Sequence, residues 1–297
     1  MSIKKGREGL VGCDRGKVFS SKVVQRVLLS AGFIPLLILV IHLDLFDALP
    51  FFIFTLALSV LGARELYSLF VRMFSFRSER WWVFCLPGAL LIILFYLNSF
   101  FDQPYLGILY ITGYTLTVGA GACVFCCWRG SFLKSFLVMV LGYAYTGLCP
   151  LAMLGIRIGY GPLYIYFLFL LGWIDDAGAY FVGIKFGRTR GIVKYSPNKS
   201  LEGYVAAFFI TVAAGIGFKL AVSGGFGPGL WETAGLGFLV AVLAPAGDIV
   251  ESVVKRKAGT KDSSALLPGF GGVLDIFDSI LFASPVYCMM LIVLLKY

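Results

Sequence analysis

The stretch WWVFCLPGALLIILFYLNSF, residues 81–100, contains no charged side chain. An α-helix needs about 20 mainly apolar residues to cross the hydrocarbon core of a bilayer, which is ~30 Å thick. The run has that length and composition, so it predicts a helix that spans a membrane.

Similar runs recur along the whole chain. Only 14% of the 297 residues are charged and 59% are hydrophobic, whereas soluble domains are about a quarter charged. We therefore predict an all-α, polytopic integral membrane protein with about nine spans. The predicted spans are 23–43, 49–71, 81–100, 104–127, 132–155, 162–184, 203–222, 231–250 and 278–296.

The net charge of +9 indicates how the chain is oriented in a membrane, and we do not interpret it as a sign of nucleic-acid binding. Basic residues precede the first span and recur at 72–80, 129–134, 185–199 and 255–261, while the connections near 44–47, 102 and 225 have none. Cytoplasmic connections are enriched in Lys and Arg. This alternation predicts a cytoplasmic N-terminus and a C-terminus on the far side.

Three regions follow from this pattern: a basic arm at 1–22, N-terminal spans at 23–160 that serve packing and a dimer surface, and a catalytic region at 161–297. The catalytic region is assigned from the distribution of acidic residues. Half of the 16 lie at the predicted cytoplasmic ends of spans six to nine. In the N-terminal spans, the pair Arg64-Glu65 must face protein or water.

Asp175 and Asp176 directly follow an apolar run. A charge within a span costs ~2.5–3.5 kcal/mol on insertion scales, so it usually has a partner or a function. A basic residue of another helix is one such partner for Asp176. The loop that follows is rich in basic residues, serines and glycines, a composition that suits a polyphosphate. Its candidate binding residues are Arg188, Ser196, Lys199 and Ser200, of which Ser200 or a neighbour also suits a helix N-cap.

A second cluster places Asp248, Glu251, Ser252 and Lys255 on one helix face, at i, i+3, i+4 and i+7. Carboxylates on a shared face can hold a divalent cation, and Lys255 with Arg256 can balance phosphate charge. A solvated helix end is the alternative interpretation.

A third cluster surrounds the start of the last span. Asp275 and Asp278 face the same way and are candidate metal ligands, although a carboxylate there can also cap the helix. Glycine permits close approach of a ligand to the backbone. The candidate binding residues of this cluster are Lys261, Asp262, Gly271 and Gly272.

Carboxylates, basic residues and glycine loops at one membrane face fit metal-assisted phosphoryl or nucleotidyl transfer to a lipid head group. A Ser-His-Asp hydrolase fits poorly, because the only histidine, His42, belongs to the opposite side.

The spacing Ser252-x2-Lys255-Arg256-x4-Lys261-Asp262-x4-Leu267-Pro268-Gly269-x-Gly271-Gly272-x2-Asp275-x2-Asp278 resembles the signature of phosphatidate cytidylyltransferases. Four upstream motifs, around Asp176, Arg188, Lys199 and Asp248, are similar to that family's other motifs in the same order. The resemblance covers about 170–280 closely.

This resemblance implies a dimeric membrane enzyme that converts CTP and phosphatidic acid into CDP-diacylglycerol and pyrophosphate. It implies Mg²⁺ as one or two ions, with K⁺ as a further candidate. By this carry-over Asp248, Lys255, Arg256 and Asp278 are catalytic, and Asp176, Asp248, Asp275 and Asp278 bind metal.

Four positions depart from the family pattern, of which Ser200 in place of Thr and Leu201 in place of Trp are the milder ones. Phe270 stands where the family usually has His, and Ile276 where it usually has Arg. By this comparison the chain lacks one donor in the glycine loop and one cation in the phosphate site.

Two other functions stay open at this level. One is a CTP-dependent kinase of a polyprenol or another lipid, and the other is a non-catalytic transporter or scaffold. The expected location is a bacterial inner membrane, with the active site facing the cytoplasm.

Overall fold

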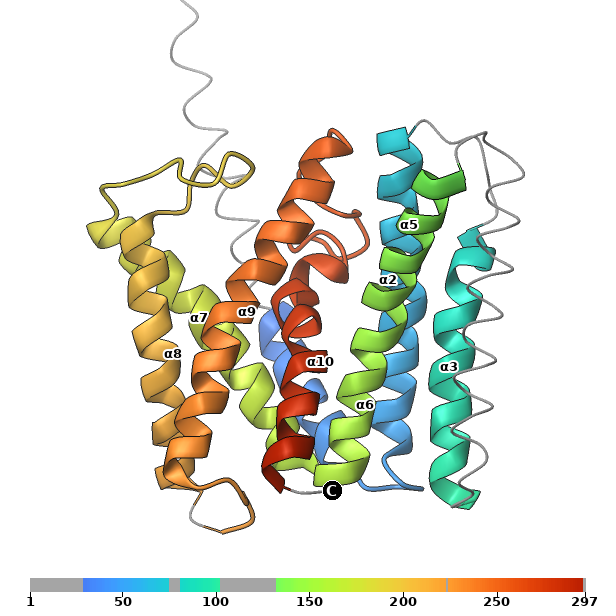
Figure 1. Ribbon diagram of the computed structural model, residues 1–297, viewed down its shortest axis with the longest axis vertical. Coiled ribbons are helices and arrows are strands. Elements are labelled where there is room, and N and C mark those ends of the chain that lie inside the picture. Colours follow the sequence, from blue (N-terminus) through green and yellow to red (C-terminus); the bar gives the residue numbers. More distant parts are fainter. Residues whose placement is uncertain (1–28, 75–80, 102–131, 223, 296–297) are drawn as a thin grey trace, which may run out of the picture.

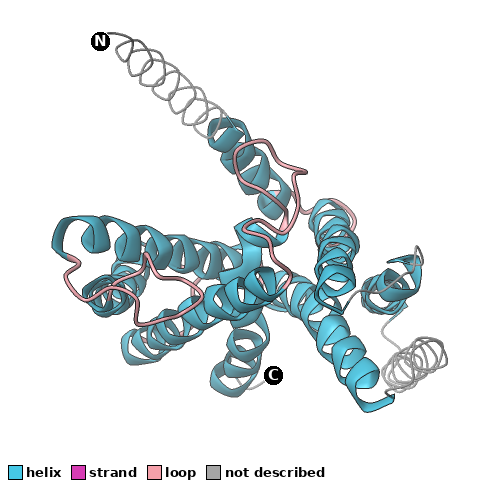
Figure 2. Cartoon of the chain, turned by 90° about the horizontal axis from the view of Figure 1, so that it is seen from above, coloured by secondary structure: helices cyan, strands magenta, loops and turns pink. Residues whose placement is uncertain are grey.

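The structure is a computed structural model that describes residues 29–74, 81–101, 132–222 and 224–295. The basic arm at 1–22 and the predicted fourth span at 104–127 lie outside these ranges. Within them the chain forms helices joined by loops, without a strand (Figure 2). The all-α prediction is therefore confirmed for the described residues.

The helices follow the predicted apolar runs closely. After the helix Leu29–His42 come α2 (Leu49–Phe74), α3 (Trp81–Phe101), α5 (Phe132–Tyr143), the π-helical turn η1 (Ala144–Leu148), α6 (Cys149–Tyr160), α7 (Pro162–Phe186), α8 (Leu201–Ala221), α9 (Leu230–Lys257) and α10 (Leu274–Leu295). Six helical stretches are long and apolar enough to cross a membrane, and Leu29–His42 and Phe84–Phe100 are shorter apolar helices. The number nine stays a prediction.

The helices form one bundle in which α10 lies between α9 and α6 (Figure 1). The connections 187–200 and 258–273 lie at one end, and the connection 222–229 and the C-terminus lie at the other. This arrangement agrees with the alternation of connections with and without basic residues. Large apolar side chains such as Phe181, Leu220 and Val293 stay exposed, as suits helices whose outer faces contact lipid.

Three helix ends differ from the predicted bounds for local reasons. Helix α8 begins at Leu201 because Ser200 caps it, its Oγ accepting from Gly203 N at 3.2 Å, which confirms the predicted cap. Helix α9 continues to Lys257, so the polar face from Asp248 to Lys255 belongs to one continuous helix. Helix α10 begins four residues early, at Leu274, where the Glu65 carboxylate accepts the N–H groups of Val273 and Leu274.

Glycines let the C-terminal helices approach closely. A Cβ at Gly203 would lie 2.6 Å from the Ala179 carbonyl oxygen, and one at Gly247 would lie 2.7 Å from the Asp278 carbonyl oxygen. Small residues at such crossings allow membrane helices to pack backbone to backbone. The α7–α8 and α9–α10 crossings thereby bring together the helix ends that carry the acidic residues.

Arg157 lies in the last turn of α6 and is buried at the far end of the bundle. Its Nε donates to the Ile41 carbonyl at 2.7 Å, and its Nη2 lies 3.3 Å from Asp44 Oδ1. Arg157 therefore joins α6 to the end of the helix Leu29–His42.

We predict that Arg157→Met destabilises the protein by about 1–3 kcal/mol, because the Ile41 carbonyl would be left buried without its donor. Thermal unfolding in detergent micelles measures this as a lower transition temperature. Lys257→Met, which changes an exposed basic residue, is the control and should be nearly neutral. Equal stability of the two variants would contradict the role given to Arg157.

Candidate functional site

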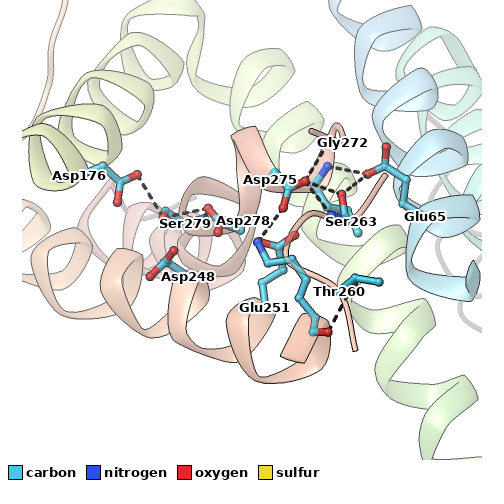
Figure 3. A network of polar contacts seen from close by, with 12 residues as sticks. Glu65, Asp176, Asp248, Glu251, Thr260, Ser263, Gly272, Asp275, Asp278 and Ser279 are labelled. Carbon is cyan, nitrogen blue, oxygen red and sulfur yellow. Dashed lines mark hydrogen bonds and ion pairs between the residues drawn. The ribbon is translucent and has the colours of Figure 1, made fainter. Parts of the chain in front are cut away.

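Three carboxylates from different helices converge at the end of the bundle that carries the basic connections. We call Asp176 of α7, Asp248 of α9 and Asp278 of α10 the acidic cluster (Figure 3). Ser279 lies between two of them, with its Oγ 3.4 Å from Asp176 Oδ2 and 3.1 Å from Asp278 Oδ1. The partner of Asp176 is therefore a serine, and within the described ranges it forms no salt bridge with a basic residue.

Lys199 connects the loop 187–200 to the acidic cluster. Its Nζ lies 2.5 Å from Asp248 Oδ2. Burial by itself would lower the pKa of Lys199, but the negative charge and the hydrogen bond of Asp248 outweigh it and raise the pKa. Lys199 is thus a charged ammonium group held beside the acidic cluster, where a phosphate group could bind it.

The rest of the loop 187–200 is held by a carboxylate of α8. Glu202 accepts from the backbone N–H of Arg188 and from both the N–H and the hydroxyl of Thr189. Asp175, the neighbour of Asp176, is buried and accepts from Thr211 Oγ1 on α8 at 3.2 Å. Asp175 and Glu202 are therefore hydrogen-bonded within the protein and hold its helices and loop in place.

Lys255 is buried between two carboxylates. Its Nζ lies 2.7 Å from Glu251 Oε2 and 2.6 Å from Asp275 Oδ1. A buried charge needs such partners, because desolvation costs several kcal/mol per ion. The proposed contact of Lys255 with phosphate stays a prediction, and in this arrangement its ammonium group links α9 to the start of α10.

Glu251 has one oxygen without a donor. Its Oε1 is buried and finds no hydrogen-bond donor in the described structure, while its carboxyl group lies against that of Asp278. Two adjacent buried carboxyl groups repel each other unless a proton or a cation lies between them. This oxygen adds Glu251 to the groups that could hold a divalent cation.

The sequence did not reveal the partner of Glu65. This α2 carboxylate is only 5% exposed, and it accepts from Ser263 Oγ, Ser264 Oγ, Val273 N and Leu274 N at 2.7–3.0 Å. The expectation that Glu65 faces protein is confirmed. A residue of the N-terminal spans thereby holds the loop 258–273 and the first turn of α10.

Asp275 completes this network (Figure 3). Its Oδ2 accepts from Ser263 N at 2.8 Å and from Gly272 N at 2.7 Å, and it lies 2.9 Å from Ser263 Oγ, whose single proton it shares with Glu65. With Lys255 on its other oxygen, Asp275 lies in the first turn of α10, the place of the dipole partner that the sequence left as an alternative, and it holds the loop that precedes the helix. Its role as a metal ligand stays a prediction.

The two predicted glycines make room for these carboxylates. Gly271 has a φ of +98°, and a Cβ there would lie 2.5 Å from Asp275 Oδ2. A Cβ at Gly272 would lie 1.9 Å from Ser263 Oγ and 2.4 Å from Glu65 Oε2. The groups that approach the glycine backbone in this structure are therefore side chains of the protein itself.

The remaining predicted residues lie around this end of the bundle. Ser196 and Ser252 are half-buried, and four charged side chains are exposed: Arg188, Arg256, Lys261 and Asp262. Among the described residues no group of three or more His, Cys, Asp or Glu side chains has the geometry of a metal site. The oxygen atoms of the acidic cluster and Glu251 nevertheless have the chemistry that Mg²⁺ prefers.

A bundle of apolar helices with carboxylates and basic side chains gathered at one end defines a polytopic membrane protein with a polar site at one end of the bundle. Comparison with known proteins assigns it more closely. The chain belongs to the cytidylyltransferase family, whose model matches residues 24–294.

Several curated bacterial relatives are named phosphatidate cytidylyltransferase. The protein of Staphylococcus aureus strain COL is 34% identical over 164 residues, which are 55% of this chain and 62% of the relative. The protein of Thermotoga maritima is 42% identical over 122 residues, which are 38% of this chain and 43% of the relative. The matched part thus spans less than two thirds of each relative, and the family resemblance is confirmed.

We predict that Glu65→Gln destabilises the protein by about 1–3 kcal/mol, because an amide NH2 would face buried donors in place of a carboxylate oxygen. Thermal unfolding in detergent measures the change. Glu232→Gln is a matched control, since Glu232 also accepts a backbone N–H at a helix start, from Gly229 at 2.7 Å, but is exposed. An effect of Glu65→Gln no larger than that of the control would contradict its role.

Proposed function

We propose that this protein transfers CMP from CTP to phosphatidic acid, giving CDP-diacylglycerol and pyrophosphate. The observation that carries the proposal is the acidic cluster with Lys199, placed at one end of a membrane bundle in a chain of the cytidylyltransferase family. The names of the relatives support the choice of substrates.

The reaction brings two phosphate-bearing substrates together. An oxygen of the lipid phosphate forms a bond to the α-phosphorus of CTP, the bond from the α-phosphorus to the bridging oxygen breaks, and pyrophosphate leaves with that electron pair. Both substrates are anions, and so is the acidic cluster. Positive charge is therefore required at this place.

Asp176, Asp248 and Asp278 would hold Mg²⁺, with Glu251 Oε1 as an additional oxygen and Asp275 as the further predicted ligand. The metal would supply positive charge to the phosphate oxygens. We propose one or two divalent ions, with K⁺ as a further candidate.

The basic residues would bind the substrates. Lys199 stays protonated beside Asp248 and can exchange this partner for a phosphate oxygen. The exposed Arg188, Arg256 and Lys261 can hold the triphosphate or the lipid phosphate, together with Ser196 and Ser252. Lys255 would contribute through its charge and by fixing Asp275.

The bacterial relatives and the basic connections support a proposal for the location and orientation of the protein. We propose that the protein lies in a bacterial inner membrane, with the acidic cluster facing the cytoplasm, and forms a homodimer through the N-terminal spans.

Purified protein with labelled CTP, phosphatidic acid and Mg²⁺ should release pyrophosphate and form CDP-diacylglycerol. We predict that Asp278→Asn abolishes this turnover without lowering the transition temperature, because the acidic cluster loses a charge. Asp47→Asn, an exposed carboxylate at the far end, should keep full activity. Formation of CDP and a phosphorylated lipid would indicate a kinase instead, and absence of both products under every divalent cation would reject catalysis of either kind.

Cysteine labelling tests the orientation. In a variant without the seven natural cysteines, we predict that a membrane-impermeant maleimide added to intact spheroplasts labels Trp231→Cys but not Ile192→Cys. These exposed positions lie at opposite ends of the bundle. Opening the membrane should make both reactive, and labelling of Ile192→Cys alone before opening would invert the proposed topology.

A further inference from the structure

An apolar cavity of about 300 Å³ lies beside the loop 258–273. Its walls come from four parts of the chain: residues 29–34 of the first described helix, Trp173 of α7, Leu267 and Phe270 of the loop, and Ile276 of α10. Ligand cavities range from about 300 to 1,000 Å³, so this one admits part of a lipid rather than a whole diacyl lipid.

The cavity adjoins the polar site. Trp173 lies one helical turn before Asp176 on α7, and Ile276 lies one turn before Ser279 on α10. Asp176 Oδ2 and Ser279 Oγ are themselves 3.4 Å apart. Because a helical turn rises about 5.4 Å, a molecule with a polar head and an apolar tail could reach both places at once.

The loop wall of the cavity is fixed by backbone hydrogen bonds. Leu267 N donates to the Gly271 carbonyl at 2.8 Å, and the N–H groups of Phe270 and Gly271 donate back to the Leu267 carbonyl at 3.1 and 3.0 Å. This closed turn presents Leu267 and Phe270 to the cavity. The next residue of the same loop, Gly272, donates to Asp275 on the polar side.

Phe270 and Ile276 are also two of the four positions that depart from the family pattern described above. The structure places both in the wall of this cavity. Both side chains are apolar, so this part of the wall favours an apolar occupant.

We propose that the cavity binds one acyl chain of the lipid substrate, and that Phe270 and Ile276 are specificity-determining residues for that chain. This inference rests on the proposed function. The lipid phosphate must reach the acidic cluster, and the acyl chains must leave it through apolar surroundings. The cavity is an apolar space that begins one helical turn away from the cluster.

Ile276→Trp tests the proposal by filling the cavity. With dioleoyl phosphatidic acid we expect KM to rise at least about tenfold, the lower end of the discrimination that apolar pockets provide. With dihexanoyl phosphatidic acid, whose short chains need little of the cavity, and with CTP, KM should stay within about twofold of the unmodified protein. Ile292→Trp, an exposed position on the same helix, is the matched control and should change none of these values.

Fluorescence gives a readout that does not depend on turnover. Phosphatidic acid brominated along its acyl chains should quench Trp173 in detergent, and the quenching should saturate with lipid. The saturable part should disappear in Trp173→Phe and weaken in Ile276→Phe, which narrows the cavity without adding a second indole to its wall.

The outcomes separate the two proposals. Equal loss of activity of Ile276→Trp with long and short lipids, or no loss with either, would overturn the acyl-chain site. Quenching unaffected by Ile276→Phe would overturn it as well. Unmodified protein that forms no CDP-diacylglycerol with any lipid would overturn the proposed function instead, and saturable quenching would still report whether an acyl chain enters the cavity.

Discussion

The hydrogen bonds of Glu65 are the interaction on which the polar end of the bundle depends. A buried carboxylate in an apolar bundle must find donors, because an unpaired charge there is costly. Glu65 finds four, two serine hydroxyls and the N–H groups of Val273 and Leu274. The start of α10, and with it the position of Asp275 and Asp278, is thus tied to α2 in the N-terminal part of the chain.

A second constraint is the close passage of the helices that carry the acidic cluster. Gly203 and Gly247 leave no room for a side chain at their crossings. Their small size lets α7, α8, α9 and α10 approach closely enough for carboxylates of three helices to meet, while Lys199 and Lys255 compensate part of the charge. The carboxylate oxygens that these lysines do not balance include Glu251 Oε1, and they leave a place for a divalent cation and the substrate phosphates.

Much of this organisation could be read from the sequence. The apolar runs located the helices, Ser200 was identified as a cap, and the spacing of Asp248, Glu251 and Lys255 placed them on one face of α9. These features are local, since they depend on helical periodicity and on side-chain chemistry within a few residues. The partners of Glu65 and the cavity around Phe270 and Ile276 were not predicted, because each joins segments far apart in the chain.

The sequence alone therefore determined the helical class, the course of most spans and the residues available for phosphate and metal chemistry. Only the tertiary structure decided how these residues divide their roles. Asp275 is surrounded by donors and holds the loop before α10, Asp278 faces other carboxylates, and Ile276 between them lines an apolar cavity. Helical periodicity makes the side chains of neighbouring residues point in different directions, but only the packing of distant helices determines which groups each side chain contacts.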